Sequence, residues 1–342
     1  MPVRRDFHHG GHRIGAVYPC PRQVGARCIL TRREPGESNA PLLRRLWTYQ
    51  AERFPVFKTA TLLAAFSAAS INVSAMLAGR ELPGLATYAA AFTVLFILFF
   101  QLRACDEVKD ASDDQRYRPE RPIPRGLVSQ RLITGIAVVL VPVAILAAWA
   151  LSPWLLLPLA AVWLWLALMT AEFGVPRWLK ARPMLYLVSH MLIMPLIDLF
   201  VTGCEWLTRS GMPPAGLWLF LALSFANGCV IEIGRKLYAP QNERPGVETY
   251  TALHGVNRAT VMWVACLTVS LSLLAGVGFA VSAPKSIMAA GVIAYAAVTT
   301  IALRFRATPN SETQKAVDMA AGMWVFVCYM SAGFLPLLAK GY

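Results

Sequence analysis

Charged residues are scarce in this chain: 15% of its 342 residues are Asp, Glu, Lys or Arg, whereas 56% are hydrophobic. That balance lies far from the composition of soluble domains. Several segments reach the 18 or more predominantly apolar residues that a bilayer-spanning helix needs. No apolar run follows the N-terminus early enough to form a secretory signal peptide. The composition therefore argues against a soluble fold and predicts an all-α, polytopic membrane protein.

The chain also lacks any Cys-x-x-Cys pair, and its cysteine count of seven is odd. Both features argue against a disulfide framework, because such frameworks use paired cysteines at regular spacings. We therefore expect the cysteines to be reduced and to pack as small buried hydrophobic side chains.

Nine apolar segments are long enough to be spans. They cover residues 57–78, 83–103, 129–150, 153–173, 183–203, 214–234, 259–281, 285–303 and 319–339. If the N-terminus is cytoplasmic and the spans alternate, all but four of the 32 Lys and Arg residues fall on the cytoplasmic side. This asymmetry supports the span count and the orientation, since Lys and Arg accumulate in cytoplasmic loops. It also explains the net charge of +13 without a nucleic acid partner.

Residues 1–48 form a separate basic segment in which Gly and Pro are scattered, and we expect most of it to be a disordered N-terminal tail. Residues 49–342 then form one membrane domain. Its two long connections, 104–128 and 235–258, lie on the same predicted side, each after an even-numbered span. This arrangement predicts that the two loops meet over one site.

The strongest signal is acidic and ends the second span. Glu107, Asp110 and Asp114 follow one another at i, i+3 and i+7, so a continuous helix would place the three carboxylates on one face, beside Asp106. Like charges this close repel one another unless a cation lies among them. Hard oxygen ligands suit Mg²⁺, which usually shares its coordination with substrate phosphates. The spacing therefore predicts a Mg²⁺ site for a phosphate-bearing substrate at the membrane surface.

A rigid basic loop follows directly, with the sequence Arg-Pro-Glu-Arg-Pro-Ile-Pro-Arg-Gly over residues 118–126. Its prolines stiffen the chain, and Arg118, Arg121 and Arg125 carry planar forks suited to phosphate oxygens.

Together the two pieces resemble the first signature of the UbiA-type membrane prenyltransferase superfamily, of which 4-hydroxybenzoate polyprenyltransferases are typical. That signature reads Asn-Asp-x-x-Asp-x-x-x-Asp, then Arg-Pro-x-Pro-x-Gly. Its acidic positions fall on Glu107, Asp110 and Asp114, and Asp106 takes the Asn place. The resemblance covers residues 49–340 and implies a helical bundle around a central cavity. It also implies that Mg²⁺ bridges acidic helix ends to an isoprenoid diphosphate, with Asp110, Asp114 and Glu107 catalytic.

The second signature of that family departs here. Gly246 and Thr249 match, but the usual acidic positions hold Arg235, Tyr238 and Asn242. Glu232 stands about one helical turn earlier and is the remaining metal-ligand candidate, with Glu243 also nearby. Arg235 and Lys236 can neutralise diphosphate directly. The alternative for both is ordinary anchoring at the membrane interface.

Three further residues are weaker candidates. Lys180, between the fourth and fifth spans, is a candidate diphosphate contact or simply a residue of the positive-inside pattern. His190 and Asn227 lie within spans and are candidates for the acceptor site or the cavity. The alternative for each is an interhelical hydrogen bond.

The predicted function is Mg²⁺-dependent transfer of a prenyl group from an isoprenoid diphosphate to an unidentified lipophilic or aromatic acceptor. The expected location is the bacterial inner (plasma) membrane, with the active site facing the cytoplasm. Three alternatives stay open: a UbiA-type terpene cyclase, transfer of a phosphoribosyl or other sugar-phosphate group to a polyprenyl phosphate, and a non-enzymatic transporter. Acids clustered at one surface, without repeats of broken midplane helices, argue against transport.

Overall fold

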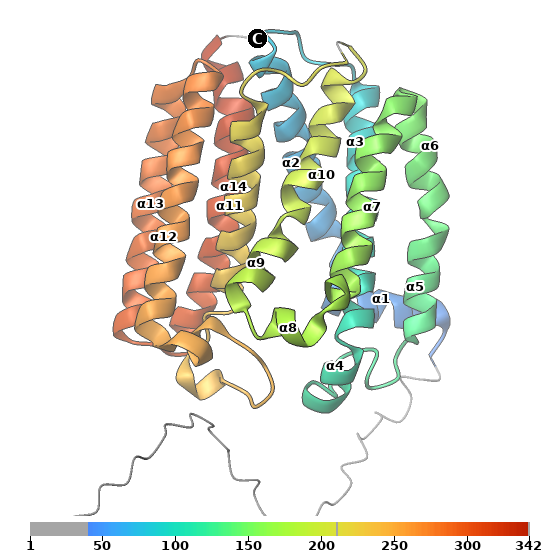
Figure 1. The fold of residues 1–342 in the computed structure, drawn as a ribbon, viewed down its shortest axis with the longest axis vertical. Coiled ribbons are helices and arrows are strands. Elements are labelled where there is room, and N and C mark those ends of the chain that lie inside the picture. The colour runs from blue at the N-terminus through green and yellow to red at the C-terminus, as the bar shows by residue number, and fades with distance from the viewer. Residues whose placement is uncertain (1–39, 210, 341–342) are drawn as a thin grey trace, which may run out of the picture.

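A computed structural model describes residues 40–209 and 211–340, and within them it contains only helices and their connections (Figure 1). Nine helical segments of the described chain are long and apolar enough to cross a membrane, which confirms the predicted number. The first four are α2 (Val56–Leu77), α3 (Leu85–Lys109), α5 with α6 (Gln130–Val139, Val141–Leu151), and η1 with α7 (Pro153–Leu155, Leu156–Thr170). The other five are α9 with α10 (Pro183–Met191, Ile193–Trp206), α11 (Leu217–Arg235), α12 (Tyr250–Ala280), α13 (Pro284–Ala307) and α14 (Ser311–Lys340).

Two spans are interrupted close to a proline. α5 gives way to α6 at Leu140, two residues before Pro142, and α9 gives way to α10 at Leu192, three residues before Pro195. Proline has no backbone N–H and its ring crowds the preceding turn, so each interruption has a local cause. The second one matters for function, because it makes α9 a short helix that ends inside the bundle.

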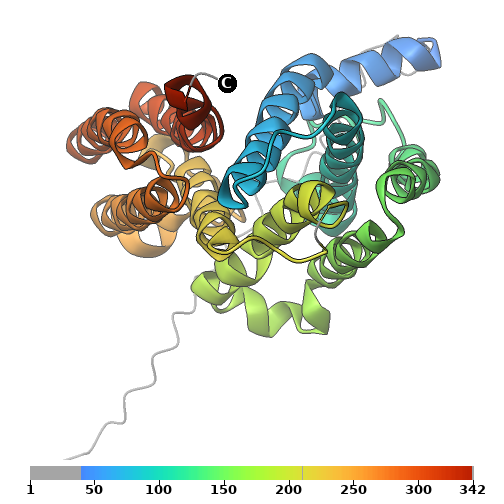
Figure 2. The ribbon, with the colours of Figure 1, turned by 90° about the horizontal axis from the view of Figure 1, so that it is seen from above.

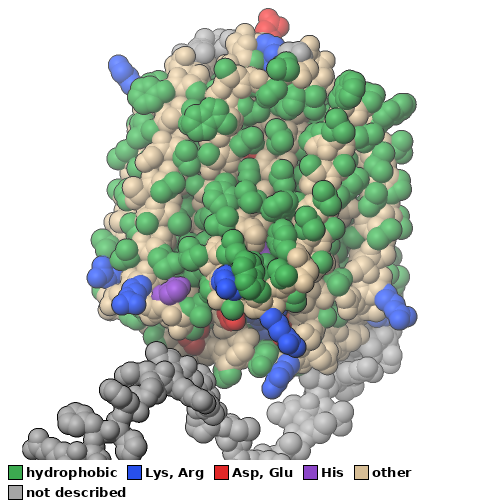
Figure 3. All heavy atoms as spheres, viewed as in Figure 1, with side chains coloured by type: hydrophobic (Ala, Val, Ile, Leu, Met, Phe, Trp, Pro, Cys, Tyr) green, Lys and Arg blue, Asp and Glu red, His purple; other side chains and the backbone are tan. Residues whose placement is uncertain are grey.

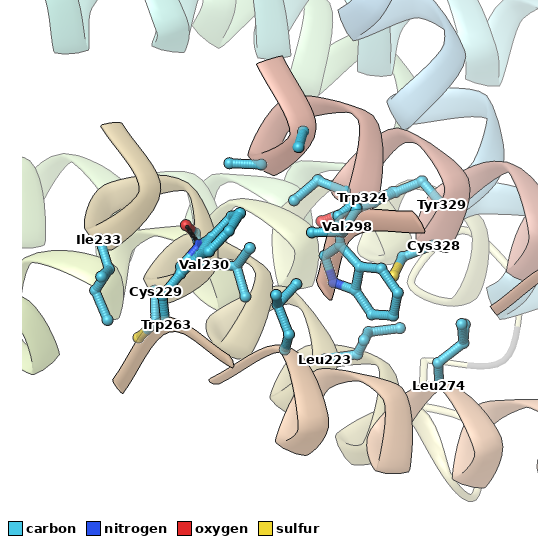
Figure 4. Close-up of a cluster of buried hydrophobic side chains, with 14 of the residues drawn as sticks. Leu223, Cys229, Val230, Ile233, Trp263, Leu274, Val298, Trp324, Cys328 and Tyr329 are labelled. Atoms are coloured by element: carbon cyan, nitrogen blue, oxygen red, sulfur yellow. Dashed lines mark hydrogen bonds between the residues drawn. The ribbon is translucent and has the colours of Figure 1, made fainter. Parts of the chain in front are cut away.

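The spans pack into two hydrophobic clusters. One joins α2 to α11, α12, α13 and α14 around the fully buried indoles of Trp263 and Trp324. Figure 4 shows the two indoles among side chains of α11, α12, α13 and α14. The other joins α2 to α3, α6, α7 and α10 around Phe200. Helix α2 contributes to both, so it connects the two halves of the bundle.

Four short helices lie at one end of the bundle, which we call the α4 end: α1 (Leu42–Arg53), α4 (Ala111–Tyr117), α8 (Pro176–Lys180) and η3 (Pro240–Asn242). Figures 1 and 2 show that α1 runs across the bundle rather than along it. Residues 42–48, assigned to the tail in the sequence analysis, are therefore helical. Residues 1–39 of that segment lie outside the described chain.

The surface agrees with a membrane position. Apolar side chains cover the flank seen in Figure 3, and Lys and Arg gather towards its α4 end. Large apolar residues on the flanks are strongly exposed, such as Leu157 at 65%, Ile293 at 72% and Trp218 at 66%. Such exposure suits contact with lipid rather than water.

Two spans begin earlier than the hydropathy predicts. α12 starts at Tyr250 instead of residue 259, and α14 starts at Ser311 instead of residue 319. The extra turns carry charged residues such as Arg258 and Asp318, and those of α12 are set off by a break at Gly255, which has φ 76° and ψ 157°. Thr249 fixes the start of α12, because its hydroxyl oxygen accepts a hydrogen bond from Ala252 N at 3.0 Å.

Candidate active site

The acidic signature lies where α3 passes into α4 at the α4 end. The prediction of one continuous helix through it is wrong, because α3 ends at Lys109, α4 begins at Ala111, and Asp110 between them has φ −91° and ψ 7°. The i to i+4 hydrogen bonds continue on both sides, from Asp110 N to Asp106 O and from Asp114 N to Asp110 O. The chain therefore bends at Asp110, and Glu107 on α3 and Asp114 on α4 have different neighbours.

Two of the predicted metal ligands are already bound by arginine. Arg53 Nε on α1 donates to Glu107 Oε1 at 2.7 Å, and the side chain of Glu107 is only 3% exposed. Arg121 and Arg118 donate to the two oxygens of Asp114 at 2.5 and 3.3 Å. The carboxylates of Glu107 and Asp114 thus hold α1 and the proline-rich loop in place.

The other carboxylates are more available. Asp106 is 47% exposed and makes only long contacts, 3.6 Å to Arg103 and 3.9 Å to Lys109. Asp110 makes no ion pair or side-chain hydrogen bond within the described residues. Glu232, at the end of α11, lies close enough to Asp106 to repel it electrostatically, as does Asp110. These three acids stand at the C-terminal ends of helices, where the negative end of the helix dipole disfavours a carboxylate.

The second acidic position is paired with a lysine one turn away. Lys236 Nζ lies 2.7 Å from Glu232 Oε1. Burial alone would lower the pKa of the Lys236 ammonium, but the neighbouring Glu232 carboxylate raises it above its ordinary value. Arg235 is exposed at the same helix end. Glu243, by contrast, accepts hydrogen bonds from the hydroxyls of Thr249 and Thr251, at 2.7 Å each, and so stabilises its own loop.

One nitrogen of an arginine side chain near these acids lacks a partner. Arg103 on α3 has a buried Nε with no hydrogen-bond acceptor in the described part of the protein. Asp106 and Glu107 attract its charge, Arg53 and Arg235 repel it, and its contact with Asp106 is long at 3.6 Å. A buried donor without an acceptor is unfavourable unless an acceptor such as an anion completes it.

Beside these groups lies what we call the Tyr186 cluster: Lys109, Tyr186, His190 and Lys236. Lys109 Nζ is 3.1 Å from the Tyr186 hydroxyl and 5.6 Å from the ring centroid, so the ammonium lies beyond the hydroxyl and not over the ring face. Lys236 Nζ is 5.9 Å from the same centroid. The ring of His190 stacks on Tyr186 at 3.8 Å. Lysines from α3 and the end of α11 therefore converge on one tyrosine of α9.

The two long loops meet, as the sequence analysis predicted. Gly246, at φ +78°, lies so close to the Tyr117 ring that an added Cβ would stand 2.1 Å from Tyr117 Cζ. Arg244 and Glu120 form an ion pair at 3.3 Å across the same junction. Only glycine permits this backbone angle and this approach without strain.

The remaining sequence candidates have other partners. Arg125 donates to both oxygens of Glu52 on α1, at 2.9 and 2.8 Å. Lys180 pairs with the buried Glu172 at 3.3 Å. Asn227 Oδ1 accepts from Ser270 Oγ at 2.7 Å, which links α11 to α12 inside the bundle, while its Nδ2 has no partner among the described atoms.

Comparison with known proteins now decides the family. The model of the UbiA prenyltransferase family matches residues 67–327, which include both acidic helix ends, the Tyr186 cluster and the two loops. The chain belongs to this family.

Two solved structures share its fold. The structure of a digeranylgeranylglyceryl phosphate synthase superposes with a TM-score of 0.58 at 14% identity, over 86% of this chain and 99% of that one. A UbiA homolog from Aeropyrum pernix K1 superposes with a TM-score of 0.56 at 16% identity, over 77% and 97% of the two chains. No curated protein sequence matches the chain.

The donor set of this UbiA prenyltransferase fits a divalent cation of limited protein coordination. No three His, Cys, Asp or Glu side chains of the described residues form a ready metal cluster. Asp106, Asp110 and Glu232 nevertheless supply hard oxygen atoms near an unpaired arginine donor. Mg²⁺ bound by one or two carboxylates, with phosphate and water completing its shell, needs no more than that.

Three residues of this site were missed in the sequence analysis: Arg103, Lys109 and Tyr186. The sequence analysis gave Arg103 and Lys109 no role of their own, and nothing in their spacing indicates an arginine nitrogen without an acceptor. Tyr186 stands four residues before His190, which is one helical turn, and this spacing was the one available signal.

Proposed function

We propose that this UbiA-family chain catalyses Mg²⁺-dependent transfer of a prenyl group from an isoprenoid diphosphate to an acceptor in the membrane. The site is the α4 end, which faces the cytoplasm of a bacterial cell in this proposal. Its partners are the donor diphosphate, a lipophilic or aromatic acceptor and the bilayer, and no nucleic acid is involved.

Asp106, Asp110 and Glu232 hold the metal. Bound Mg²⁺ would neutralise the diphosphate oxygens as negative charge develops on the leaving group. Glu107 and Asp114 do not bind the metal in this proposal. They orient Arg53, Arg118 and Arg121 and hold the proline-rich loop in place. This assignment moves the metal-binding role from Glu107 and Asp114 to Asp106 and Asp110, which lack close ion-pair partners, and keeps Glu232, which would have to exchange its contact with Lys236 for the metal.

Basic side chains bind the diphosphate. Arg103, Lys109, Arg235 and Lys236 stand around the acidic helix ends, where an anion would relieve their mutual repulsion. Arg118, Arg121 and Lys180 border this region, and Arg125 positions the loop through Glu52. Preorganised cations of this kind stabilise the departing diphosphate as the C–O bond breaks.

The unpaired Arg103 Nε is the observation that carries this proposal. A buried donor without an acceptor costs about 1–3 kcal/mol, and Arg103 Nε finds no acceptor among the described residues. Diphosphate supplies the missing acceptor.

Mg²⁺-dependent diphosphate release tests the proposal. Purified protein in detergent is given geranyl, farnesyl, geranylgeranyl and longer prenyl diphosphates, with and without Mg²⁺. We expect Asp110→Asn to lower release by about 10²–10³-fold without loss of folded protein, because one oxygen ligand is lost beside the leaving group. Asp113→Asn is the control, since Asp113 is exposed on α4.

Release that is independent of Mg²⁺, or equal in the Asp110→Asn and Asp113→Asn proteins, would refute the metal assignment. Analysis of the organic product then distinguishes transfer from cyclisation, because a cyclase leaves a hydrocarbon or alcohol with no acceptor attached.

A further inference from the structure

The side chain of His190 lies just beyond the charged end of the site. It stands four residues after Tyr186 on α9, so about 6 Å further along the helix axis. His190 is buried, with 4% of its surface exposed, and its imidazole lies close enough to Lys109, Glu232 and Lys236 to feel their charges electrostatically. His190 thus occupies the layer next to the position that the proposed diphosphate would take.

Hydrogen bonding fixes which ring nitrogen carries the proton. Nδ1 of His190 lies 2.9 Å from the backbone carbonyl oxygen of Tyr186, and Ser189 Oγ lies 3.3 Å from the same nitrogen. A carbonyl oxygen only accepts, so Nδ1 must donate. A second proton on the ring would add positive charge beside two ammonium groups. The neutral ring therefore leaves a bare lone pair on Nε2.

Aromatic residues hold the plane of this imidazole. Tyr186 stacks on it at 3.8 Å with an interplanar angle of 13°, and Phe173 meets it edge-on at 6.1 Å. Phe173 in turn packs against Trp165 at 5.4 Å, and the Trp165 indole donates to Ser189 O at 2.9 Å. The ring orientation is therefore set by packing from α7, η2 (Glu172–Gly174) and α9.

The turn that presents Phe173 is strained. Glu172 and Phe173 have φ of +47° and +55°, in the left-handed region that non-glycine residues rarely adopt. This backbone conformation is costly for residues with a Cβ, and strain of this kind concentrates at functional sites.

The lone pair on Nε2 has no use within the protein. Nε2 is buried and has no hydrogen-bond partner among the described residues. Leaving a buried acceptor unpaired is unfavourable, and an apolar side chain such as leucine or phenylalanine would avoid that cost.

We propose that His190 Nε2 binds the nucleophilic O–H or N–H group of the prenyl acceptor. This inference rests on the proposed prenyl transfer and deepens it by naming the acceptor class, a hydroxyl or amine and not a bare carbon. The C–O bond to diphosphate breaks, the acceptor oxygen or nitrogen forms a bond to the allylic carbon, and its proton passes to Nε2. The proton then leaves to solvent with the diphosphate, so atoms and charge balance.

The test uses one donor, tritiated geranylgeranyl diphosphate, and a total lipid extract of bacterial membranes as the acceptor source. Half of the extract is treated with acetic anhydride, which caps its hydroxyl and amine groups. Full-length wild-type, His190→Gln and His190→Phe proteins are compared, and their folding is checked by elution profile and thermal midpoint. Diphosphate release without extract is measured in parallel and reports on the donor half of the reaction.

We expect wild-type protein to label the native extract and to leave the acetylated extract unlabelled. His190→Phe keeps the stacking but removes the base, so transfer should fall about 10²–10⁴-fold while release changes less than about twofold. His190→Gln keeps an acceptor oxygen without a proton-accepting nitrogen. It should retain the apparent KM for extract and lose kcat, a division that a purely structural role would not produce.

Labelling of the acetylated extract, or unchanged transfer by both variants, would overturn the inference. Release with no labelled lipid in either extract would also overturn it, because the cation would then be quenched by water or by itself. Absence of release in wild-type protein would refute the proposed function first.

Discussion

The two ends of the bundle both bury carboxylates beside arginines, but they differ in how completely the groups are paired. At the end opposite α4, Glu205 is 0% exposed and both of its oxygens are bound, by Arg80 at 2.8 Å twice and by Ser74 at 2.7 Å. Arg209 adds a contact at 3.8 Å and donates to the carbonyl oxygen of Glu81.

The α4 end leaves groups of both signs incomplete. Arg103 Nε and His190 Nε2 are buried without partners in the described chain, and Asp106 makes only long ion-pair contacts. A fully paired cluster stabilises the fold, whereas an incompletely paired one keeps interactions available for a ligand. The contrast therefore favours a structural role for the Glu205 cluster and supports the site proposed at the α4 end.

The largest effect should come from breaking the paired end. Glu205→Ala leaves Arg80 and Arg209 without their carboxylate, and loss of one partner of a buried ion pair costs about 3–5 kcal/mol. We expect a clearly lower midpoint of thermal unfolding in detergent, while diphosphate release per folded molecule stays unchanged. Glu81→Ala is the control, because it removes an exposed carboxylate at the same end. Equal midpoints for the two variants would contradict the structural role.

The converse pattern is expected at the α4 end. Arg103→Gln removes a partly buried cation whose attraction by Asp106 and Glu107 is opposed by repulsion from Arg53 and Arg235, so the thermal midpoint should change little. Diphosphate release should fall about 10²-fold, since one preorganised donor to the leaving group is lost. Arg258→Gln serves as the control, because Arg258 is an exposed residue of α12. A lower midpoint with unchanged release would place Arg103 among the structural arginines.

The fold was predictable from hydropathy and charge because lipid imposes length and apolarity on each span. All nine candidate spans of the described chain were recognised from these properties. Helix α1 was not predicted, because its sequence is amphipathic, only one of its residues, Tyr49, is buried, and the helix lies across the bundle. Burial raises the pKa of the Tyr49 hydroxyl, which no composition argument could indicate.

The site was predictable in location and less so in residue roles. The spacing of Glu107, Asp110 and Asp114 indicated a shared face, but it did not indicate which of them are paired with arginine. Arg53 is 54 positions from Glu107, whereas Arg121 is seven positions from Asp114, in the following loop. A pairing as distant as that of Arg53 leaves no periodic signal, so local spacing could not show that Glu107 is already bound.

A smaller effect is expected at the junction of the two loops, where a second substitution should partly reverse the first. Gly246→Ala introduces a Cβ at φ +78° against the Tyr117 ring, and the backbone angle alone costs about 1–2 kcal/mol. We expect lower diphosphate release and a lower thermal midpoint. Tyr117→Ala in the same chain should restore part of both, because it removes the clash and leaves only the backbone cost. Gly322→Ala is the control, since a Cβ there meets nothing within 4 Å.

The smallest effect should come from the partly exposed ion pair between Arg125 and Glu52, which includes neither Glu205 nor the proposed metal ligands. Arg125 donates to Glu52, and this hydrogen bond lowers the pKa of the Glu52 carboxyl below its ordinary value. A carboxyl with a lowered folded-state pKa adds stability above its unfolded-state pKa, near 4.3, and loses it as the pH falls through the folded-state value. The pair is partly exposed, so Glu52→Gln should cost only about 0.2–1 kcal/mol at pH 7. The difference in thermal midpoint between wild-type and Glu52→Gln proteins should therefore be small at pH 7 and shrink as the pH falls below 4. A difference that grew towards acid would show that Arg125 does not stabilise the ionised form of Glu52.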